Sequence, residues 1–196
     1  MTLYLKDALW LDPADFSTAA THLAVDEGAF GQAAPVTSIP QGAKTFDCKG
    51  RLVTRSFACG HHHAYSSLAR GMPAPPKVPA NFPQILEYVW WRLDKRLDPE
   101  MVEASALACA VACAKNGVTF VVDHHSSPGA VRGSLETIAR AFEKVGVGHL
   151  LCYETSCRDG MDTARAGLEE TDAYLSSGRK GHVGLHASFT VDDSVL

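Results

Sequence analysis

An alternation of strand-like and helix-like segments runs from residue 51 to the end of the chain, and it constrains the fold more than any other feature. Short apolar runs, rich in β-branched residues or too brief for a helix, recur at residues 52–60, 118–122, 150–153 and 182–189. Segments with helical periodicity or capping residues stand between them, at residues 85–93, 98–117, 135–146 and 163–175. This order predicts an α/β fold with a parallel sheet built from βαβ units.

The helix at 98–117 has both of its ends marked in the sequence. Asp98 is a suitable N-cap, Pro99 takes the first helical position, and Gly117 stands just beyond the last turn. The apolar run Val118–Val122 follows at once and is too short for another helix. We therefore expect a buried strand directly after this helix.

The first 50 residues have a different pattern. Short pieces of alternating polar and apolar residues are divided by turns, which predicts a small antiparallel β unit with too few strands to bury its own apolar face. At the other end, residues 190–196 resemble the cap and first turn of a helix. We expect from both ends that the chain is the N-terminal part of a longer protein.

Polar residues gather where the predicted strands end. His61–His63 follow the first strand, Asp123–His125 the second and Glu154 the third, and His186 stands toward the end of the fourth. In a (β/α) barrel the carboxyl ends of all strands meet at one face, where active sites are built. These positions predict a shared site at that face.

The pair His61 and His63 is the strongest candidate within this set. Side chains two positions apart in extended backbone point to the same side, so both imidazoles project together while His62 points away. Neutral imidazole is a common zinc ligand, so the pair predicts two ligands of a metal ion. The alternative is a chance run of histidines in a solvated loop. For Asp123–His125 the alternative is a structural role, with Asp123 capping a turn and an imidazole bonded to a backbone carbonyl.

Composition excludes several classes of partner. The formal net charge is −4 and no basic stripe is present, which argues against nucleic acid. No run of about 18 apolar residues predicts a membrane span, and charged residues interrupt the apolar N-terminus, unlike a signal peptide. The six cysteines show no Cys-x-x-Cys spacing, which is typical of reduced thiols in a cytoplasmic protein.

Three segments resemble one known family. His61-x-His63 with the following Ala64–Gly71 resembles the strand-one metal motif of the amidohydrolase superfamily, in its branch of aminohydrolases and chlorohydrolases. Gly184–Thr190 resembles the fourth-strand Pro-His-Ala-x-x-Thr segment of that branch, and Gly50–Thr54 resembles the entry into the barrel. Together they span essentially the whole chain.

The resemblance implies a (β/α)8 TIM-like barrel whose first half occupies residues 51–196, preceded by part of a β-sandwich domain at 1–50. It also implies a divalent metal ion, zinc or iron, that activates water to attack an amidine-like carbon and release ammonia. His61 and His63 would be its ligands, and His186 and Glu87 would contact the substrate. His125 is a further candidate substrate contact from its position.

The sequence departs from the family in three places. Arg55-Ser56 stands where the family usually has Pro-Gly, and Leu185 stands where it has Pro. The family's third metal histidine and proton-shuttling Glu, a further His and a metal Asp follow strands five, six and eight, so they are expected beyond Leu196. We therefore assign no catalytic residue within the chain and expect it to be inactive alone.

The leading hypothesis is the N-terminal portion of a cytoplasmic metal-dependent hydrolase that deaminates a small heterocycle or amidine, and that is a homo-oligomer at full length. One alternative keeps the scaffold and replaces ammonia by halide as the leaving group. The other is a complete, non-catalytic half barrel that binds metal and pairs with a second polypeptide or with itself.

Overall fold

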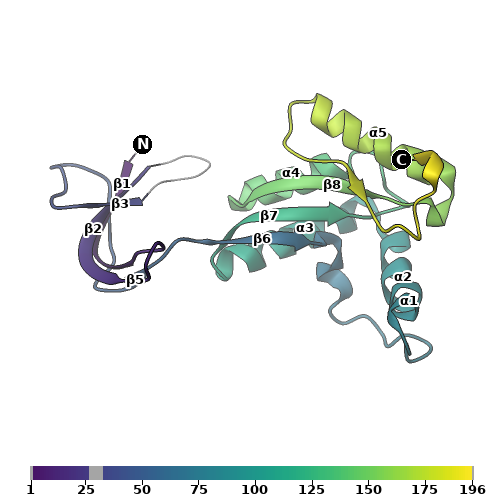
Figure 1. The fold of residues 1–196 in the computed structure, drawn as a ribbon, viewed down its shortest axis with the longest axis horizontal. Coiled ribbons are helices and arrows are strands. Elements are labelled where there is room, and N and C mark those ends of the chain that lie inside the picture. Colours follow the sequence, from purple (N-terminus) through teal and green to yellow (C-terminus); the bar gives the residue numbers. More distant parts are fainter. Residues whose placement is uncertain (1, 27–32, 196) are drawn as a thin grey trace. The chain divides into compact units, whose positions relative to one another are not determined.

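The computed structural model describes residues 2–26 and 33–195, and the chain forms two compact units, residues 1–56 and 57–196 (Figure 1). The boundary lies a few residues after the division expected from the sequence at residue 50. Among the described residues, no helix is long and apolar enough to cross a membrane.

The first unit is one small sheet with the strand order β3-β2-β1-β4, and β5 also pairs with β1. Its β1–β2 and β2–β3 pairings are antiparallel, as expected, but β4 and β5 run parallel to β1, so the purely antiparallel prediction was wrong. Four buried side chains form its core: Ala8, Trp10, Leu23 and Cys48. The strands are β1 (Thr2–Leu11), β2 (Thr18–Asp26), β3 (Ala33–Val36), β4 (Thr45–Asp47) and β5 (Leu52–Val53).

The second unit contains a parallel sheet with the order β6-β7-β8-β9, which confirms the α/β prediction. Two predicted strands differ from the structure. The first begins at Phe57 because Leu52–Val53 belongs to the first unit, where it pairs with β1, and the fourth is reduced to two residues. The strands are β6 (Phe57–His62), β7 (Val118–His125), β8 (Gly148–Thr155) and β9 (Gly184–Leu185).

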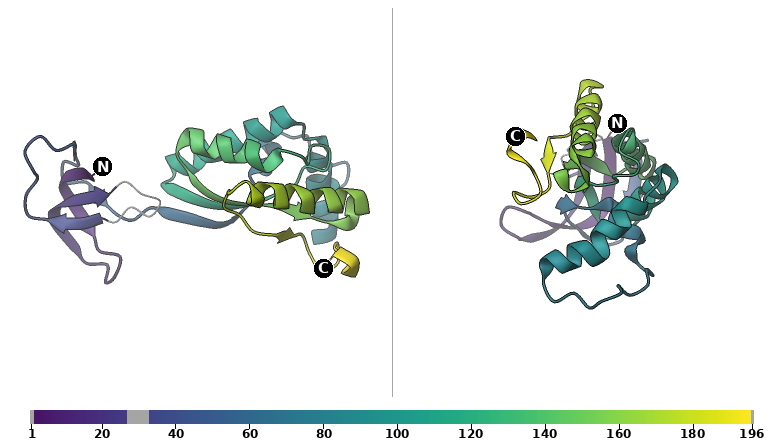
Figure 2. Two further views of the ribbon diagram at one scale, coloured as in Figure 1. Left: turned by 90° about the horizontal axis from the view of Figure 1, so that it is seen from above. Right: turned by 90° about the vertical axis from the view of Figure 1, so that its right-hand side faces the viewer.

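Three helices pack against one face of this sheet (Figure 2). They are α3 (Pro99–Lys115), α4 (Ser134–Val145) and α5 (Met161–Ser176). The capping of α3 is as the sequence predicts, since the Asp98 carboxylate accepts a hydrogen bond from the Met101 amide at 2.8 Å. Fully buried side chains from helices and strands form the core between them, among them Leu135, Ile138, Phe142 and Leu151.

The connection from β6 to α3 begins with the 3₁₀ turn η1 (Ala64–Ala69) and ends in a continuous helical stretch at residues 82–96. The periodic segment at 85–93 lies within this stretch and is helical throughout, as its pattern indicates. The hydrogen-bond pattern changes along the stretch, which consists of α1 (Phe82–Ile85), the π-helical η2 (Leu86–Trp90), α2 (Trp91–Leu93) and the 3₁₀ turn η3 (Asp94–Arg96). Two further 3₁₀ turns follow β8 and β9: η4 (Cys157–Asp159) and η5 (Asp193–Val195).

Candidate active site

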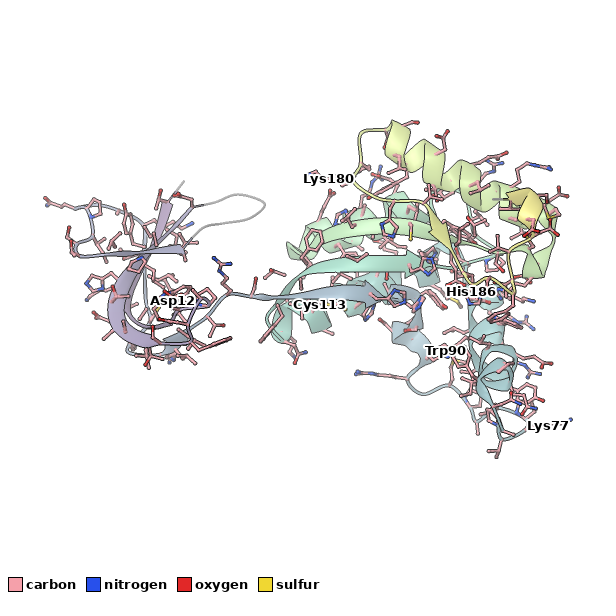
Figure 3. The ribbon with its side chains drawn as sticks, viewed as in Figure 1. Asp12, Lys77, Trp90, Cys113, Lys180 and His186 are labelled. Carbon is pink, nitrogen blue, oxygen red and sulfur yellow. The ribbon has the colours of Figure 1, made fainter. Side chains whose placement is uncertain are left out.

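The carboxyl ends of the strands in the second unit surround a cavity of about 580 Å³. Figure 3 shows Trp90 and His186 beside this end of the sheet, whereas Cys113 lies toward the opposite end. One side of the cavity is apolar, formed by Leu86, Trp90 and Trp91. The polar side includes His61, His63, His124, Glu154 and His186.

His61 and His63 face each other at the end of β6. Their Nε2 atoms are 3.1 Å apart, close to the separation of about 3.3 Å between two nitrogens that bind one tetrahedral ion at 2.0–2.1 Å. The Nδ1 atom of His63 lies 2.8 Å from the carbonyl oxygen of His124 and donates to it, which leaves Nε2 free. His62 instead contacts the Cys109 thiol, with Nδ1 and Sγ 3.6 Å apart. The pair thus has the geometry that strand alternation predicts.

Asp123 fixes the backbone directly after this pair. Its carboxylate is fully buried, and one oxygen accepts a hydrogen bond from the Ala64 amide at 2.6 Å. Asp123 therefore holds the end of β6 against β7, and it does not line the cavity.

Strand alternation separates the two histidines that follow. Val122 and His124 line the cavity, whereas Val121 and His125 are fully buried on the side of the helices. The Nε2 atom of His125 is 2.8 Å from the Ser127 hydroxyl, and burial lowers the pKa of His125 to about 4. His125 therefore does not occupy the position of a substrate contact. His124 lies in the predicted Asp123–His125 group, but its sequence position assigned it no separate role, and burial lowers its pKa to about 4 as well.

The structure brings His186 to the cavity but not Glu87. Glu87 is exposed on η2 and is not among the residues that line the cavity. His186 is part of the lining, and its Nδ1 atom lies 2.7 Å from the Thr190 hydroxyl. Its ring packs edge-on toward Trp91, with 6.5 Å between the ring centroids. Two of the expected substrate contacts, Glu87 and His125, thus lie outside the cavity.

Glu154 also lines the cavity, as its place at a strand end predicts, although its sequence position alone assigned it no role. Its carboxylate is buried among three imidazoles, 3.5 Å from His124 Nδ1, 3.7 Å from His186 Nε2 and 3.8 Å from His63 Nδ1. Burial raises the pKa of Glu154 to about 8, and the charge of Arg158 partly opposes that shift. The one sequence signal for this residue was its place at the end of a strand.

The donor atoms of the site suit a divalent metal ion. One ligand atom from each of His63, His124 and Glu154 lies within 4.8 Å of the others. Together with the Nε2 pair of His61 and His63, this set combines the nitrogen and oxygen ligands that zinc takes in proteins. The chain therefore presents a possible divalent metal site at the carboxyl end of its sheet.

The chain is similar in sequence to a curated deaminase. A 5'-deoxyadenosine deaminase from Methanobrevibacter smithii is 24% identical over 202 residues, covering 100% of this chain and 44% of that protein. The chain thus spans less than half the length of this relative. No protein-family model matches the chain.

Solved structures show the same fold. Guanine deaminase from C. acetobutylicum superposes on 100% of this chain and 48% of its own, with a TM-score of 0.75 and 13% identity. A triazine hydrolase variant gives a TM-score of 0.74 at 15% identity, covering 99% of this chain and 48% of its own.

An atrazine chlorohydrolase from Arthrobacter aurescens, solved in complex with zinc, gives a TM-score of 0.65 at 15% identity. It matches 93% of this chain and 46% of its own. These neighbours confirm that the parallel sheet is part of a TIM-like barrel. Together with the curated relative, they confirm the resemblance to deaminases and chlorohydrolases of the amidohydrolase superfamily, to whose N-terminal portion this chain corresponds.

Proposed function

We propose that this chain is the N-terminal half of a metal-dependent hydrolase that removes an amino group from a small heterocycle or amidine. The observation that carries the proposal is the pair of Nε2 atoms, His61 and His63, 3.1 Å apart at the floor of a cavity with one aromatic wall. The deaminases among the similar proteins support this choice of reaction.

The residues of this half would hold the metal and shape the pocket. His63 donates through Nδ1 to the His124 carbonyl, so its ring is held in the orientation that presents Nε2 to a metal beside His61. We propose zinc as this ion, because imidazole nitrogen suits it and a similar chlorohydrolase was solved with zinc. A bound divalent ion would supply Lewis-acid activation of water at neutral pH.

The apolar wall would orient the substrate. Leu86, Trp90 and Trp91 offer flat, water-excluding surfaces against which a planar ring can pack. His186 lies across from Trp91 and would contact the ring edge. Hydrolysis then replaces the C–N bond by a C–O bond, and the amino group leaves as ammonia. The remaining ligands and the proton-transfer group are expected from the second half of the barrel.

Metal content and activity of the full-length protein test this proposal together. The variants His61→Ala and His63→Ala should lose bound zinc, and a double variant should lose deamination of the purine and pyrimidine bases that the protein turns over. Lys77→Ala, in the loop that precedes α1, is the matched control and should change neither. Full zinc content and unchanged turnover in the double variant would show that the ligand assignment is wrong.

The leaving group can be identified in the same assay. Release of ammonia from amino-substituted rings supports the deaminase, whereas release of chloride from the matching chloro-substituted rings supports the chlorohydrolase alternative. The homo-oligomer and the cytoplasmic location expected from the sequence stay predictions.

A further inference from the structure

The ring of Trp91 lines the cavity, and a residue from a distant part of the chain packs against it. The guanidinium carbon of Arg158 lies over the ring, 5.2 Å from its centroid and within the reach of about 6 Å of a cation–π contact. Arg158 is not among the lining residues, so it contacts Trp91 from outside the cavity. The indole nitrogen of Trp91 is buried, and no residue in the described parts of the chain accepts a hydrogen bond from it. The orientation of the ring therefore depends on the position of Arg158.

Arg158 is itself held in place by two polar partners. Its Nη2 atom is bound to the buried carboxylate of Asp94 and donates to the Ser126 hydroxyl at 3.0 Å. Asp94 stands three residues after Trp91, so the two side chains lie on the same side of one helical turn. This turn thus contacts the guanidinium twice, through the Asp94 carboxylate and through the Trp91 ring. The charged pair is almost fully buried, which leaves the guanidinium little room to move.

This arrangement uses the shape of arginine as well as its charge. A planar guanidinium pairs with a carboxylate through its edge while its face packs on an aromatic ring, whereas the ammonium group of lysine has no such face. Stacking between two aromatic rings also depends on their relative orientation, beyond the apolar area that they bury. A change that leaves the charge at residue 158 but removes the flat contact would therefore weaken stacking on Trp91.

We propose that Arg158 is a positioning residue, which holds Trp91 in the orientation that allows its ring to stack on a planar ligand in the cavity. The inference rests on the proposed function, because it concerns ligand binding in that same cavity. Arg158 would not touch the ligand. A preference for flat rings over puckered rings of similar size would then come from the contact between Arg158 and Trp91, and not from the apolar character of the wall alone.

Two carboxamides that differ only in the shape of the ring test this inference without relying on turnover. Benzamide has a flat ring and cyclohexanecarboxamide a puckered one, and both carry the same polar group. Calorimetry on the zinc-loaded, full-length protein should show that benzamide binds about 3–10-fold more tightly. Arg158→Lys should reduce this preference to about 2-fold or less and leave the zinc content unchanged. The control Arg132→Lys changes a surface arginine and should leave both measurements unchanged.

Two further variants separate positioning from a direct contact and from loss of the fold. Trp91→Leu should abolish the preference for benzamide, and the addition of Arg158→Lys to this variant should change neither affinity, because the residue through which Arg158 acts is gone. Asp94→Asn keeps the shape of the side chain and weakens its hold on Arg158, so it should also reduce the preference. It serves as the test if Arg158→Lys does not fold.

The outcomes distinguish this inference from the proposed function. Equal affinity for both carboxamides in the unmodified protein, or an undiminished preference in Arg158→Lys, would overturn the inference. A further loss of benzamide affinity when Arg158→Lys is added to Trp91→Leu would also overturn it, because Arg158 would then act on the ligand without Trp91. The proposed function fails separately, if zinc and turnover persist without His61 and His63.

Discussion

The buried ion pair between Asp94 and Arg158 should be one of the most sensitive points of the second unit. Asp94 in η3 is 1% exposed, and the Arg158 side chain in η4 is 7% exposed. Arg158 also donates to Ser126, and its guanidinium carbon lies 5.2 Å from the centroid of Trp91. The pair therefore connects the turn before α3 to the turn after β8 and supports a wall of the cavity.

Arg158→Met removes the charge and keeps much of the side-chain volume. Asp94 would then be a buried carboxylate with the Ser126 hydroxyl at 3.4 Å as its remaining side-chain donor. Removal of one partner of a buried ion pair costs about 3–5 kcal/mol, and loss of the contact with Trp91 adds about 0.5–1 kcal/mol. Burial already raises the pKa of Asp94, so protonation of its carboxyl limits the loss. We expect the free energy of unfolding to fall by about 3–5 kcal/mol.

Urea unfolding at pH 7, followed by tryptophan fluorescence, measures this loss. Arg132→Met is the control, because Arg132 pairs with Glu169 at the surface and its removal should cost at most about 1 kcal/mol. The double variant Asp94→Leu with Arg158→Met should be more stable than Arg158→Met alone, since no buried charge is left unpaired. The reasoning is refuted if Arg158→Met costs no more than Arg132→Met, or if the double variant loses the sum of the two single losses.

Two further predictions concern the packing on the helix side of the sheet. His125 has a folded-state pKa of about 4 against 6.5 when exposed, so the unfolded chain takes up its proton first and stability falls as the pH drops from 6.5 toward 4. Urea titrations at pH 7 and pH 5 measure how far the free energy of unfolding falls between the two pH values. This fall should be about 2 kcal/mol smaller for His125→Gln than for the unmodified protein. Gly167→Ala would place a Cβ 2.6 Å from Tyr153 Cδ1. Thermal unfolding should show that the free energy of unfolding falls by about 1–3 kcal/mol, because the steric clash outweighs the gain of up to about 1 kcal/mol in helix propensity. An unchanged or raised melting temperature would contradict the close packing of α5 on β8.

The regular part of the second unit was predictable because its signals are local. The N-cap at Asp98, the glycine at 117 with φ of 73°, and the strand that follows at once are all encoded within a few residues. The segments that differ depend on distant partners. Leu52–Val53 reads as the start of the first barrel strand, yet it belongs to the first unit, where it pairs with Leu9 and Trp10. Its sequence carries no signal that separates the two pairings.

The candidate site was predictable in position but not in detail. A strand buried on both faces has apolar residues at every position, so hydropathy does not reveal which positions point toward the barrel interior. Val121 and Val122 are equally apolar, although only Val122 lines the cavity. For the same reason, the sequence does not show which of His124 and His125 points into the cavity. The packing of helices on one face of the sheet decides it.

Once the direction of one strand residue is known, alternation assigns the others. On β7, Val121, Asp123 and His125 are buried, while Val122 and His124 line the cavity. On β8 the same rule turns Tyr153 toward α5 and Glu154 toward the cavity. A buried carboxylate on the inward side cannot be explained by packing against the helices, whereas the outward Asp123 is explained by its bond to the Ala64 amide. A buried acidic residue that points into the cavity and has no close hydrogen-bond donor is therefore available to a ligand. A buried acidic residue that points outward and accepts a backbone hydrogen bond supports the fold.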